Sequence, residues 1–203
     1  MTLEIKVSKK LVPYKYAFEQ LRKRVDSIKK HKSKDLIWIL EHPLTYTSGI
    51  RSNENEVLDK KIKIIKTNRG GKITLHNPGQ KIVYFALDLN KRNKDVKNLI
   101  INIENSIIEF LKIYKISSYA DKENIGIWVN EKKIAAIGLR ITGWIAYHGF
   151  SININNSLKP YRKIIPCGLD NTKITSVKNE GHLNIKNIEK NLKEILLKNL
   201  KNI

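Results

Sequence analysis

Residues 125–154 read IGIWVNEKKIAAIGLRITGWIAYHGFSINI and show the clearest strand pattern in the chain. Three apolar runs, at 125–129, 133–141 and 145–154, are separated only by short turns at 130–132 and at Thr142-Gly143. Short apolar runs with turn residues between them are typical of consecutive antiparallel strands. The sequence therefore predicts a β-meander in the second half of the chain.

A second group of strands is predicted upstream. Candidate strands cover 62–66, 73–76 and 82–87, with turns at 68–71 and 77–80, so this part also has the pattern of a meander. Residues 36–40 form a continuous apolar run that is typical of a buried strand, and residues 3–7 alternate as a further strand would. The segment 43–60 is interpreted as a loop.

Three amphipathic helices complete the pattern. Apolar residues recur at helical spacings over 14–28, 96–111 and 185–200. The order helix, strands, helix, strands, helix predicts an α+β fold, with a mixed, largely antiparallel sheet and helices packed on it. A doubly wound parallel sheet would need regular alternation of strands and helices, which is absent. The 203 residues, 1–203, are expected to form a single domain.

Charge and cysteine content bear on the expected partners and the expected cellular location. The chain has 39 Lys and Arg residues against 19 Asp and Glu, a formal charge of +20, which would attract nucleic acid, an anionic membrane or an acidic protein. The same charge fits a compositional bias, because Lys, Asn and Ile are abundant and have A/T-rich codons. One cysteine excludes an intramolecular disulfide, and no signal core or apolar run of about 20 residues is present, so a cytoplasmic location is expected.

The single cysteine, Cys167, lies between Pro166 and Gly168. Proline fixes φ and removes a donor, and glycine admits backbone conformations that other residues avoid, so an irregular turn that presents a thiol is predicted. A lone cysteine in an intracellular enzyme is a candidate nucleophile when a proton acceptor can reach it. Free cysteines are also often inert core residues, and the setting alone leaves both interpretations open.

Three other segments combine glycine with polar side chains. In residues 69–80, paired glycines would let backbone N–H groups approach a ligand, although two ordinary hairpin turns would give the same pattern. Lys133 opens a run of small apolar residues where its ammonium would be partly desolvated and able to exchange protons, whereas most lysines are solvated. In residues 148–151, the glycine is typical of close approach by a ligand, while His148 alone fits a hydrogen-bonded sheet histidine.

Other kinds of site find no support in the sequence. The histidines at 31, 42, 76, 148 and 182 lack the paired spacing of metal ligands, so no metal is predicted. There is no Walker or G-x-G-x-x-G phosphate pattern and no G-x-S-x-G elbow. No cofactor is therefore expected.

Taken together, these segments resemble one family, the lipoyl(octanoyl) transferases. The family pattern R-G-G-x-x-T-x-H-G-P-G-Q is matched by residues 69–80, G-x-W-V-x-x-x-K-I-A-x-I-G by 126–138, H-G-x-x-x-N by 148–153, and P-C-G with a later T-S by 166–168 and 175–176. Glu41-His42-Pro43 and Tyr46-Thr47 also match, so the resemblance runs from about residue 36 to 177. Asn77 stands where the family usually has glycine, and because Asn tolerates positive φ, the turn is expected to survive.

The resemblance implies the fold of biotin and lipoate protein ligase catalytic domains and an acyltransferase that needs no metal or nucleotide. It implies that Cys167 takes octanoyl as a thioester and that Lys133 favours the thiolate and acts as acid/base. The implied partners are octanoyl–acyl carrier protein and the lipoyl domains of 2-oxoacid dehydrogenases and glycine cleavage H protein, not nucleic acid or membrane. The implied acyl-binding residues are Arg69, Gly70, Gly71, Lys72, Ile73, Thr74, Leu75, His76, Ala136, Ile137, Gly138, Gly149, Phe150 and Ser151.

Two alternatives remain open from the residues. An ATP-dependent lipoate or biotin ligase would share the fold, but it activates its acid with ATP and has no need of a nucleophilic cysteine at residue 167. A basic nucleic-acid-binding protein is suggested by charge alone, and no recognised nucleic-acid motif supports it.

Overall fold

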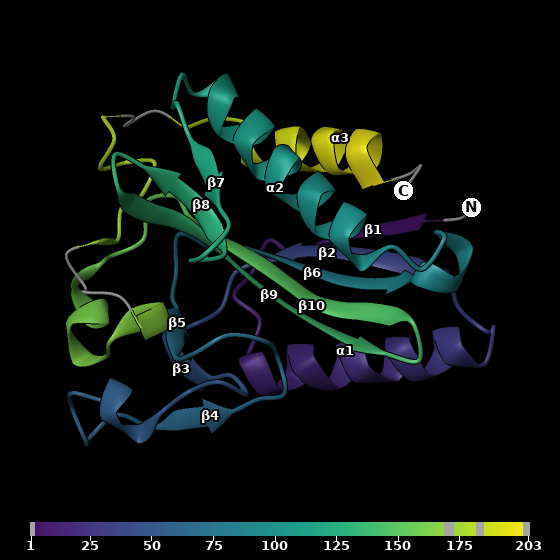
Figure 1. Ribbon diagram of the computed structural model, residues 1–203, viewed down its shortest axis with the longest axis horizontal. Coiled ribbons are helices and arrows are strands. Elements are labelled where there is room, and N and C mark those ends of the chain that lie inside the picture. Colours follow the sequence, from purple (N-terminus) through teal and green to yellow (C-terminus); the bar gives the residue numbers. More distant parts are fainter. Residues whose placement is uncertain (1–2, 169–172, 182–184, 201–203) are drawn as a thin grey trace.

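The computed structural model describes residues 3–168, 173–181 and 185–200 (Figure 1). A seven-stranded sheet forms its centre, with strand order β1-β2-β6-β10-β9-β8-β7. Neighbouring strands run antiparallel, except that β1 and β2 are parallel. The strands are β1 (Leu3–Val7), β2 (Asp35–Leu40), β6 (Gln80–Asp88), β7 (Tyr119–Asp121), β8 (Gly126–Val129), β9 (Lys132–Thr142) and β10 (Ile145–Asn153).

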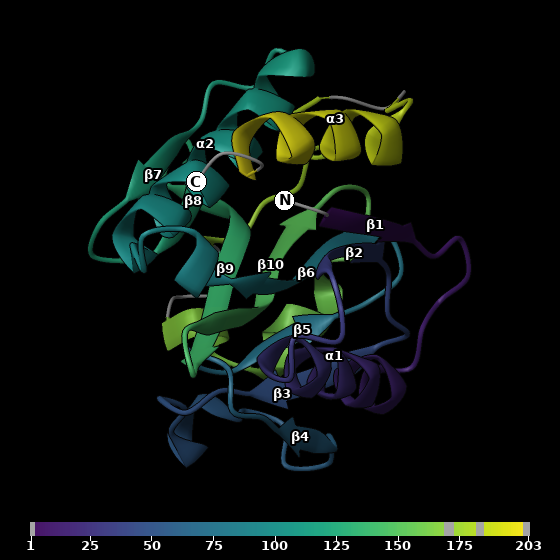
Figure 2. The same ribbon diagram turned by 90° about the vertical axis from the view of Figure 1, so that its right-hand side faces the viewer.

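Helices cover both faces of this sheet. Figure 1 and Figure 2 show α1 (Tyr14–Lys29) on one face and α2 (Val96–Ile113) with α3 (Ile188–Leu200) on the other. Side chains alternate along β6, so Ile82 and Tyr84 join the apolar cluster of α1, whereas Val83 and Phe85 join that of α2 and α3. The sheet is therefore the middle layer between two apolar cores, and every residue of β6 and β10 is buried.

Local sequence explains where the long helices begin. α1 follows Pro13, whose fixed φ and missing N–H suit the start of a helix. α2 follows Asp95, whose carboxylate accepts a hydrogen bond of 2.9 Å from the Asn98 N–H. Each helix then buries one stripe of apolar residues at three- and four-residue spacing, which fixes the face that packs on the sheet.

A three-stranded sheet corrects two predictions from the sequence. Its order is β4 (Ile64–Lys66), β3 (Thr45–Ser48) and β5 (Thr74–His76), with β3 parallel to β4 and antiparallel to β5. The predicted loop over 43–60 therefore contains a strand. The predicted meander over 62–87 is wrong, because β3 lies between β4 and β5, and β6 belongs to the large sheet. The residues of β3 are mostly polar and form no apolar run, so no pattern in the sequence indicates this strand.

The other predicted elements are confirmed with small shifts at their ends. They include the meander over 125–154, the strands at 3–7 and 36–40, and all three long helices. The irregular segment after β10 contains short 3₁₀ turns at Lys159–Lys163 and Pro166–Gly168, while part of it lies outside the described residues. The α+β fold with a mixed, largely antiparallel sheet is confirmed. Among the described helices, none combines the length and apolarity needed to cross a bilayer.

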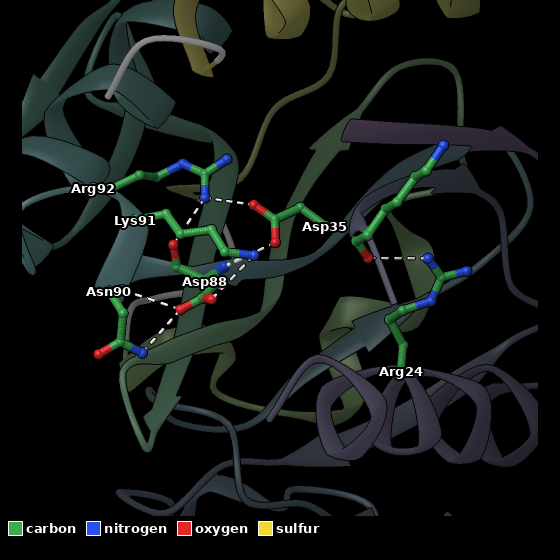
Figure 3. Close-up of polar contacts among 7 residues, drawn as sticks. Arg24, Asp35, Asp88, Asn90, Lys91 and Arg92 are labelled. Atoms are coloured by element: carbon green, nitrogen blue, oxygen red, sulfur yellow. Dashed lines mark hydrogen bonds and ion pairs between the residues drawn. The ribbon is translucent and has the colours of Figure 1, made fainter. Parts of the chain in front are cut away.

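A buried network of charged side chains lies at one end of the large sheet (Figure 3). The Arg92 guanidinium pairs with the Asp35 carboxylate and donates to the Asp88 carbonyl at 2.9 Å. Asp35 in turn accepts a 3.2 Å hydrogen bond from the Asp88 N–H. The Asp35 and Arg92 side chains are 4% and 1% exposed, so neither charge can rely on water.

Replacing Arg92 with alanine is expected to lower the free energy of unfolding by about 3–5 kcal/mol, because it leaves the Asp35 charge buried without its partner. The neighbouring Lys91, whose side chain is 48% exposed, is the control, and Lys91→Ala should cost less than about 0.5 kcal/mol. Urea unfolding at pH 7 measures both. The double variant Asp35→Leu/Arg92→Met should recover much of the loss, since it removes both charges. Equal losses for Arg92→Ala and Lys91→Ala would contradict this account.

Candidate active site

A cleft of about 230 Å³ opens on the face of the large sheet that α1 covers. Its walls come from the loop 69–72, β5, β9, β10 and the turn that contains Gly168. The structure brings most of the sequence-predicted site residues together there. Those that line the cleft are Arg69, Gly70, Gly71, Lys72, Thr74, His76, Lys133, Ala136, Ile137, Gly138, Gly149, Phe150 and Ser151.

Two of the predicted acyl-binding residues do not line this cleft. Ile73 and Leu75 pack against Tyr46, Tyr161 and Ile164 in a separate apolar cluster. They alternate with Thr74 and His76, which face the cleft, as expected where side chains point to opposite sides of an extended chain. Ile73 and Leu75 therefore hold β5 in place beside the cleft.

Arg69 shapes the loop that forms one wall. Its guanidinium donates to the Lys72 and Gly70 carbonyls at 2.8 and 3.0 Å. It also donates to the carbonyl and hydroxyl of Thr47, each at 2.9 Å, on the strand β3 that the sequence did not predict. The loop is thus fixed to the small sheet by a charged side chain that is only 8% exposed.

Gly149 is required by a close approach of two strands. A Cβ atom at this position would lie 1.8 Å from the carbonyl oxygen of Val83 on β6. The preceding residue, His148, has a φ of 65°, which is rare for a residue with a side chain. Strict alternation would place His148 opposite Gly149, towards α2 and α3, yet its ring stacks on Phe18 of α1 and lines the cleft. The left-handed backbone therefore turns this imidazole into the site, which no pattern in the sequence reveals.

Lys133 and Lys132 occupy opposite sides of β9. Lys133 is 5% exposed and lines the cleft, as expected for a partly desolvated ammonium, whereas Lys132 is exposed. The Lys133 ammonium lies 5.4 Å from the centroid of the Trp128 ring. The Lys133 side chain passes close to Gly126. A Cβ atom at residue 126 would lie 2.3 Å from Cε of Lys133, so the lysine can occupy this space only because residue 126 is glycine.

Cys167 belongs to the 3₁₀ turn Pro166–Gly168. Just before it, the Ile165 N–H donates to the Glu56 carbonyl at 2.8 Å. Further along the chain, the Thr175 N–H donates to the carbonyl of Lys133 at 3.0 Å, which joins Thr175 to the strand of the buried lysine. Gly168 lines the cleft, while the Cys167 side chain lies outside what the structure describes. The predicted turn is confirmed, and its glycine and Lys133 share one cleft.

Three buried histidines lie at or next to the cleft: His76 and His148 line it, and His42 packs edge-on against His76. His42 donates from Nδ1 to the Val12 carbonyl, so its Nε2 is free to accept the Tyr84 hydroxyl at 2.8 Å. His76 meets the Gln80 side-chain oxygen at 2.8 Å through Nδ1. Burial lowers the pKa of His42 to about 4 and, together with nearby positive charge, the pKa of His76 and of His148 to about 3. All three are therefore neutral at pH 7.

These histidines predict a loss of stability in mild acid. Their pKa values in the folded protein are lower than the value of about 6.5 in an unfolded chain, so only the unfolded state gains their protons between about pH 6.5 and 4. The free energy of unfolding should therefore be greatest above pH 6.5 and should fall by up to about 1.4 kcal/mol per pH unit for each histidine. Urea unfolding at pH 7, 6 and 5 measures this slope, and a flat profile would contradict it.

Several residues of the cleft escaped the sequence prediction. Tyr14 comes from α1, Tyr84 and Ile82 from β6, and Arg51 and the segment 123–125 from loops. Tyr14, Ile82 and Tyr84 have the spacing of core residues, and the packing of α1 over the sheet is what brings them to the site. A helical core position and a cleft-lining position look alike in a sequence.

Comparison with known proteins shows the family of this chain. The family model described as "Lipoyl protein ligase A/B catalytic domain" matches residues 13–198. The chain belongs to this family. An octanoyltransferase from Wolbachia sp. subsp. Brugia malayi (strain TRS) is 43% identical over 180 residues, covering 86% of this chain and 88% of that protein. An octanoyltransferase from Anaplasma phagocytophilum (strain HZ) is 40% identical over 187 residues, covering 89% and 90%.

Solved structures support the same fold for this lipoyl protein ligase A/B family member. Lipoate-protein ligase A bound with ATP has a TM-score of 0.75 at 13% identity, covering 98% of this chain and 86% of that one. A biotin protein ligase from Aquifex aeolicus has a TM-score of 0.51 at 14% identity, covering 98% and 69%. At such identities the likeness concerns the fold alone. The predicted family, the predicted ligase-like fold and the acyltransferase class are confirmed.

Asn77, the departure from the family pattern, is accommodated in this member by contacts of its own. The turn survives, because the Gln80 N–H donates to the Asn77 carbonyl at 3.1 Å, but the expected reason is wrong: positive φ falls on Gly79, at 86°, and not on Asn77. The Asn77 side chain instead donates to the Ser157 carbonyl at 2.8 Å and accepts from the Asn156 amide at 3.0 Å. Asparagine here fastens the turn to the segment after β10.

Proposed function

We propose that this protein transfers an octanoyl group from octanoyl–acyl carrier protein to a specific lysine of a lipoyl domain, through a thioester on Cys167. Octanoyl transfer in protein lipoylation follows from the family and from relatives that are octanoyltransferases. The observation that carries the cysteine mechanism is the buried Lys133 in the same cleft as Gly168, the neighbour of Cys167. The thiol of Cys167 and the buried ammonium of Lys133 would thus act in one site.

The first half of the proposed reaction loads the enzyme. The thiolate of Cys167 attacks the carbonyl carbon of the octanoyl thioester, and the tetrahedral intermediate collapses as the carrier thiolate leaves. A thiol with an unperturbed pKa near 8.5 is only a few per cent thiolate at neutral pH, so a nearby ammonium increases the reactive fraction. Lys133 supplies this positive charge, and it donates a proton to the departing carrier thiolate. The octanoyl group is then held by Cys167 as a thioester.

The second half transfers the acyl group to the acceptor. The ε-amine of the acceptor lysine attacks the thioester carbonyl, and Lys133, now neutral, takes the proton that this amine loses. An amide forms and the Cys167 thiolate leaves, which restores the starting charges. The proposed acceptors are lipoyl domains of 2-oxoacid dehydrogenases and glycine cleavage H protein, and a cytoplasmic location would place the enzyme with both substrates. No step uses a metal or a nucleotide.

An ATP-dependent lipoate or biotin ligase is the alternative that the fold permits, since both kinds of ligase have this architecture. The two functions differ in the acyl donor that they use and in their need for ATP. The purified protein should octanoylate a lipoyl domain from octanoyl–acyl carrier protein without ATP, and should not do so from free octanoate with ATP and Mg²⁺. Transfer that requires ATP would overturn the proposal. Salt-dependent gel shifts with DNA and RNA test the nucleic-acid alternative.

The charge of +20 is expected to speed encounter with an acidic carrier protein. The kcat/KM value for octanoyl–acyl carrier protein should therefore fall as salt rises through about 0.1 M, where the Debye length is about 10 Å. An uncharged octanoyl thioester is the control and should respond little. An equal response of both substrates would mean that the charge is compositional and does not serve recognition of the carrier.

A further inference from the structure

An ion pair between Glu56 and Lys72 lies beside the turn that carries Cys167. Oε1 of Glu56 is 3.2 Å from Nζ of Lys72, and the two side chains are 7% and 45% exposed. Oε2 of Glu56 accepts hydrogen bonds of 3.3 Å from the backbone N–H groups of Asn53 and Ile73. Because these backbone groups fix the buried carboxylate, the carboxylate can hold the Lys72 ammonium in one place.

The pair contacts the chain on both sides of Cys167. On one side, the Glu56 carbonyl accepts the hydrogen bond from the Ile165 N–H. On the other side, a Cβ atom at Gly168 would lie 2.5 Å from Nζ of Lys72, and the next nearest atoms are Cδ and Cε of the same lysine. A carbon–carbon bond is about 1.5 Å long, so the ammonium lies within about 4 Å of the Gly168 Cα atom. The ammonium, and not the carboxylate, therefore faces the residue that follows Cys167.

This position distinguishes Lys72 from the other charged residues of the cleft. Its ammonium lies no more than about 8 Å from the Cα atom of residue 167, because consecutive Cα atoms are about 3.8 Å apart. At such a distance in a partly exposed cleft, an ammonium shifts the ionisation of a thiol by about three- to ten-fold. The other charged residues that line the cleft are Arg51, Arg69, Glu123 and Lys133, while His76 and His148 are neutral at pH 7.

We propose that Lys72, held by Glu56, is a second positive charge of the active site that increases the thiolate fraction of Cys167. The proposal rests on the proposed function, because that function makes this thiolate the nucleophile of the first half and the leaving group of the second. Lys133 gives up its proton between the two halves, so its charge is lost while the acyl-enzyme exists. Lys72 takes no part in that proton transfer, and its charge remains. Glu56 is a positioning residue, since it acts through Lys72.

The single cysteine allows a direct test. Alkylation by iodoacetamide, followed by the mass of the intact protein, reports on residue 167 alone. Only the thiolate reacts, so the ratio of the rate at pH 7 to the rate at pH 9.5 reports the ionised fraction and cancels differences in access. For Lys72→Met, this ratio should fall about three- to ten-fold. Lys72→Arg keeps the charge, and its ratio should stay near that of the wild type.

Two further variants separate the local charge from general effects. Lys163→Met is the matched control, because Lys163 is 50% exposed, pairs with Asp59 at 3.0 Å and does not line the cleft. Its ratio should stay at the wild-type value. The double variant Lys72→Met/Glu56→Gln also removes the carboxylate that Lys72→Met leaves unpaired, so it should recover part of the loss. A pair with a purely structural role would be weakened further by the second substitution.

The alkylation test does not depend on turnover. If the wild-type protein takes up no octanoyl group from octanoyl thioester, the proposed function fails, whereas the alkylation ratio still measures the effect of Lys72. If loading occurs, its single-turnover rate at pH 7 should fall in Lys72→Met by about the same factor as the ratio. Urea unfolding shows whether each variant is folded, and Lys72→Gln, with the same expected ratio, replaces a Lys72→Met variant that is not. A wild-type ratio in the folded variant, or an equal fall in Lys163→Met, would overturn the proposal.

Discussion

Replacing Cys167 with alanine is expected to abolish both the acyl-enzyme and octanoyl transfer. Alanine offers no sulfur to accept the acyl group, so the rate should fall by at least about four orders of magnitude, as is usual when a nucleophile is removed. Transfer to a lipoyl domain measures turnover, and the mass of the intact protein measures the acyl-enzyme. The change leaves Pro166 and Gly168 in place, so the turn that carries residue 167 should persist.

Cys167→Ser is the informative companion variant. A serine hydroxyl is a far weaker nucleophile at neutral pH, and an octanoyl ester on it would be attacked slowly by the acceptor amine. This variant should therefore accumulate an octanoyl ester that reacts slowly with the acceptor amine, and its turnover should be low. Full transfer by the alanine variant would contradict the nucleophilic role of Cys167.

Lys133→Ala is expected to lower transfer by about two to four orders of magnitude, the usual range for lost acid/base assistance. Lys132→Ala is the matched control on the next residue of the same strand, and it should have little effect because its side chain is exposed. Lys133→Met keeps the length of the stem without its charge, and it should be as inactive as the alanine variant. Single-turnover transfer with each variant measures both half-reactions.

The contrast between the two lysines is what tests the structure. Equal activity of Lys133→Ala and Lys132→Ala, or a reversed order of effects, would contradict the assignment of the proton-transfer role to Lys133.

The large sheet and the helices were predictable because their residues follow simple periods. The runs over 125–154 alternate with short turns, and the helix over 96–113 repeats apolar residues every three or four positions. The small sheet was not predictable for two reasons. β3 is a short run of mostly polar residues, and its parallel partner β4 lies more than a dozen residues later in the chain, so no local pattern indicates the pairing. Its importance appears only in the contact of Thr47 with Arg69.

The site was predictable where motifs carry it and unpredictable where packing builds it. Residues 69–76 and 136–138 stood out through glycine and their resemblance to a family, and most of them meet at the cleft. Tyr14 and Tyr84 reach the cleft because α1 packs over β6, which needs the three-dimensional arrangement of distant segments. His148 reaches it through a left-handed backbone inside a strand, against the alternation that a sequence argument assumes.

We propose that octanoyl passes through a thioester on Cys167, and the mass of the intact protein would reveal this acyl-enzyme. After mixing with octanoyl–acyl carrier protein in the absence of ATP and acceptor, the protein should gain the mass of one octanoyl group. Hydroxylamine, which cleaves thioesters, should remove this increment, and peptide mapping should locate it to Cys167. A wild-type protein that transfers octanoyl to a lipoyl domain without forming this adduct, or that carries it on another residue, would contradict the account.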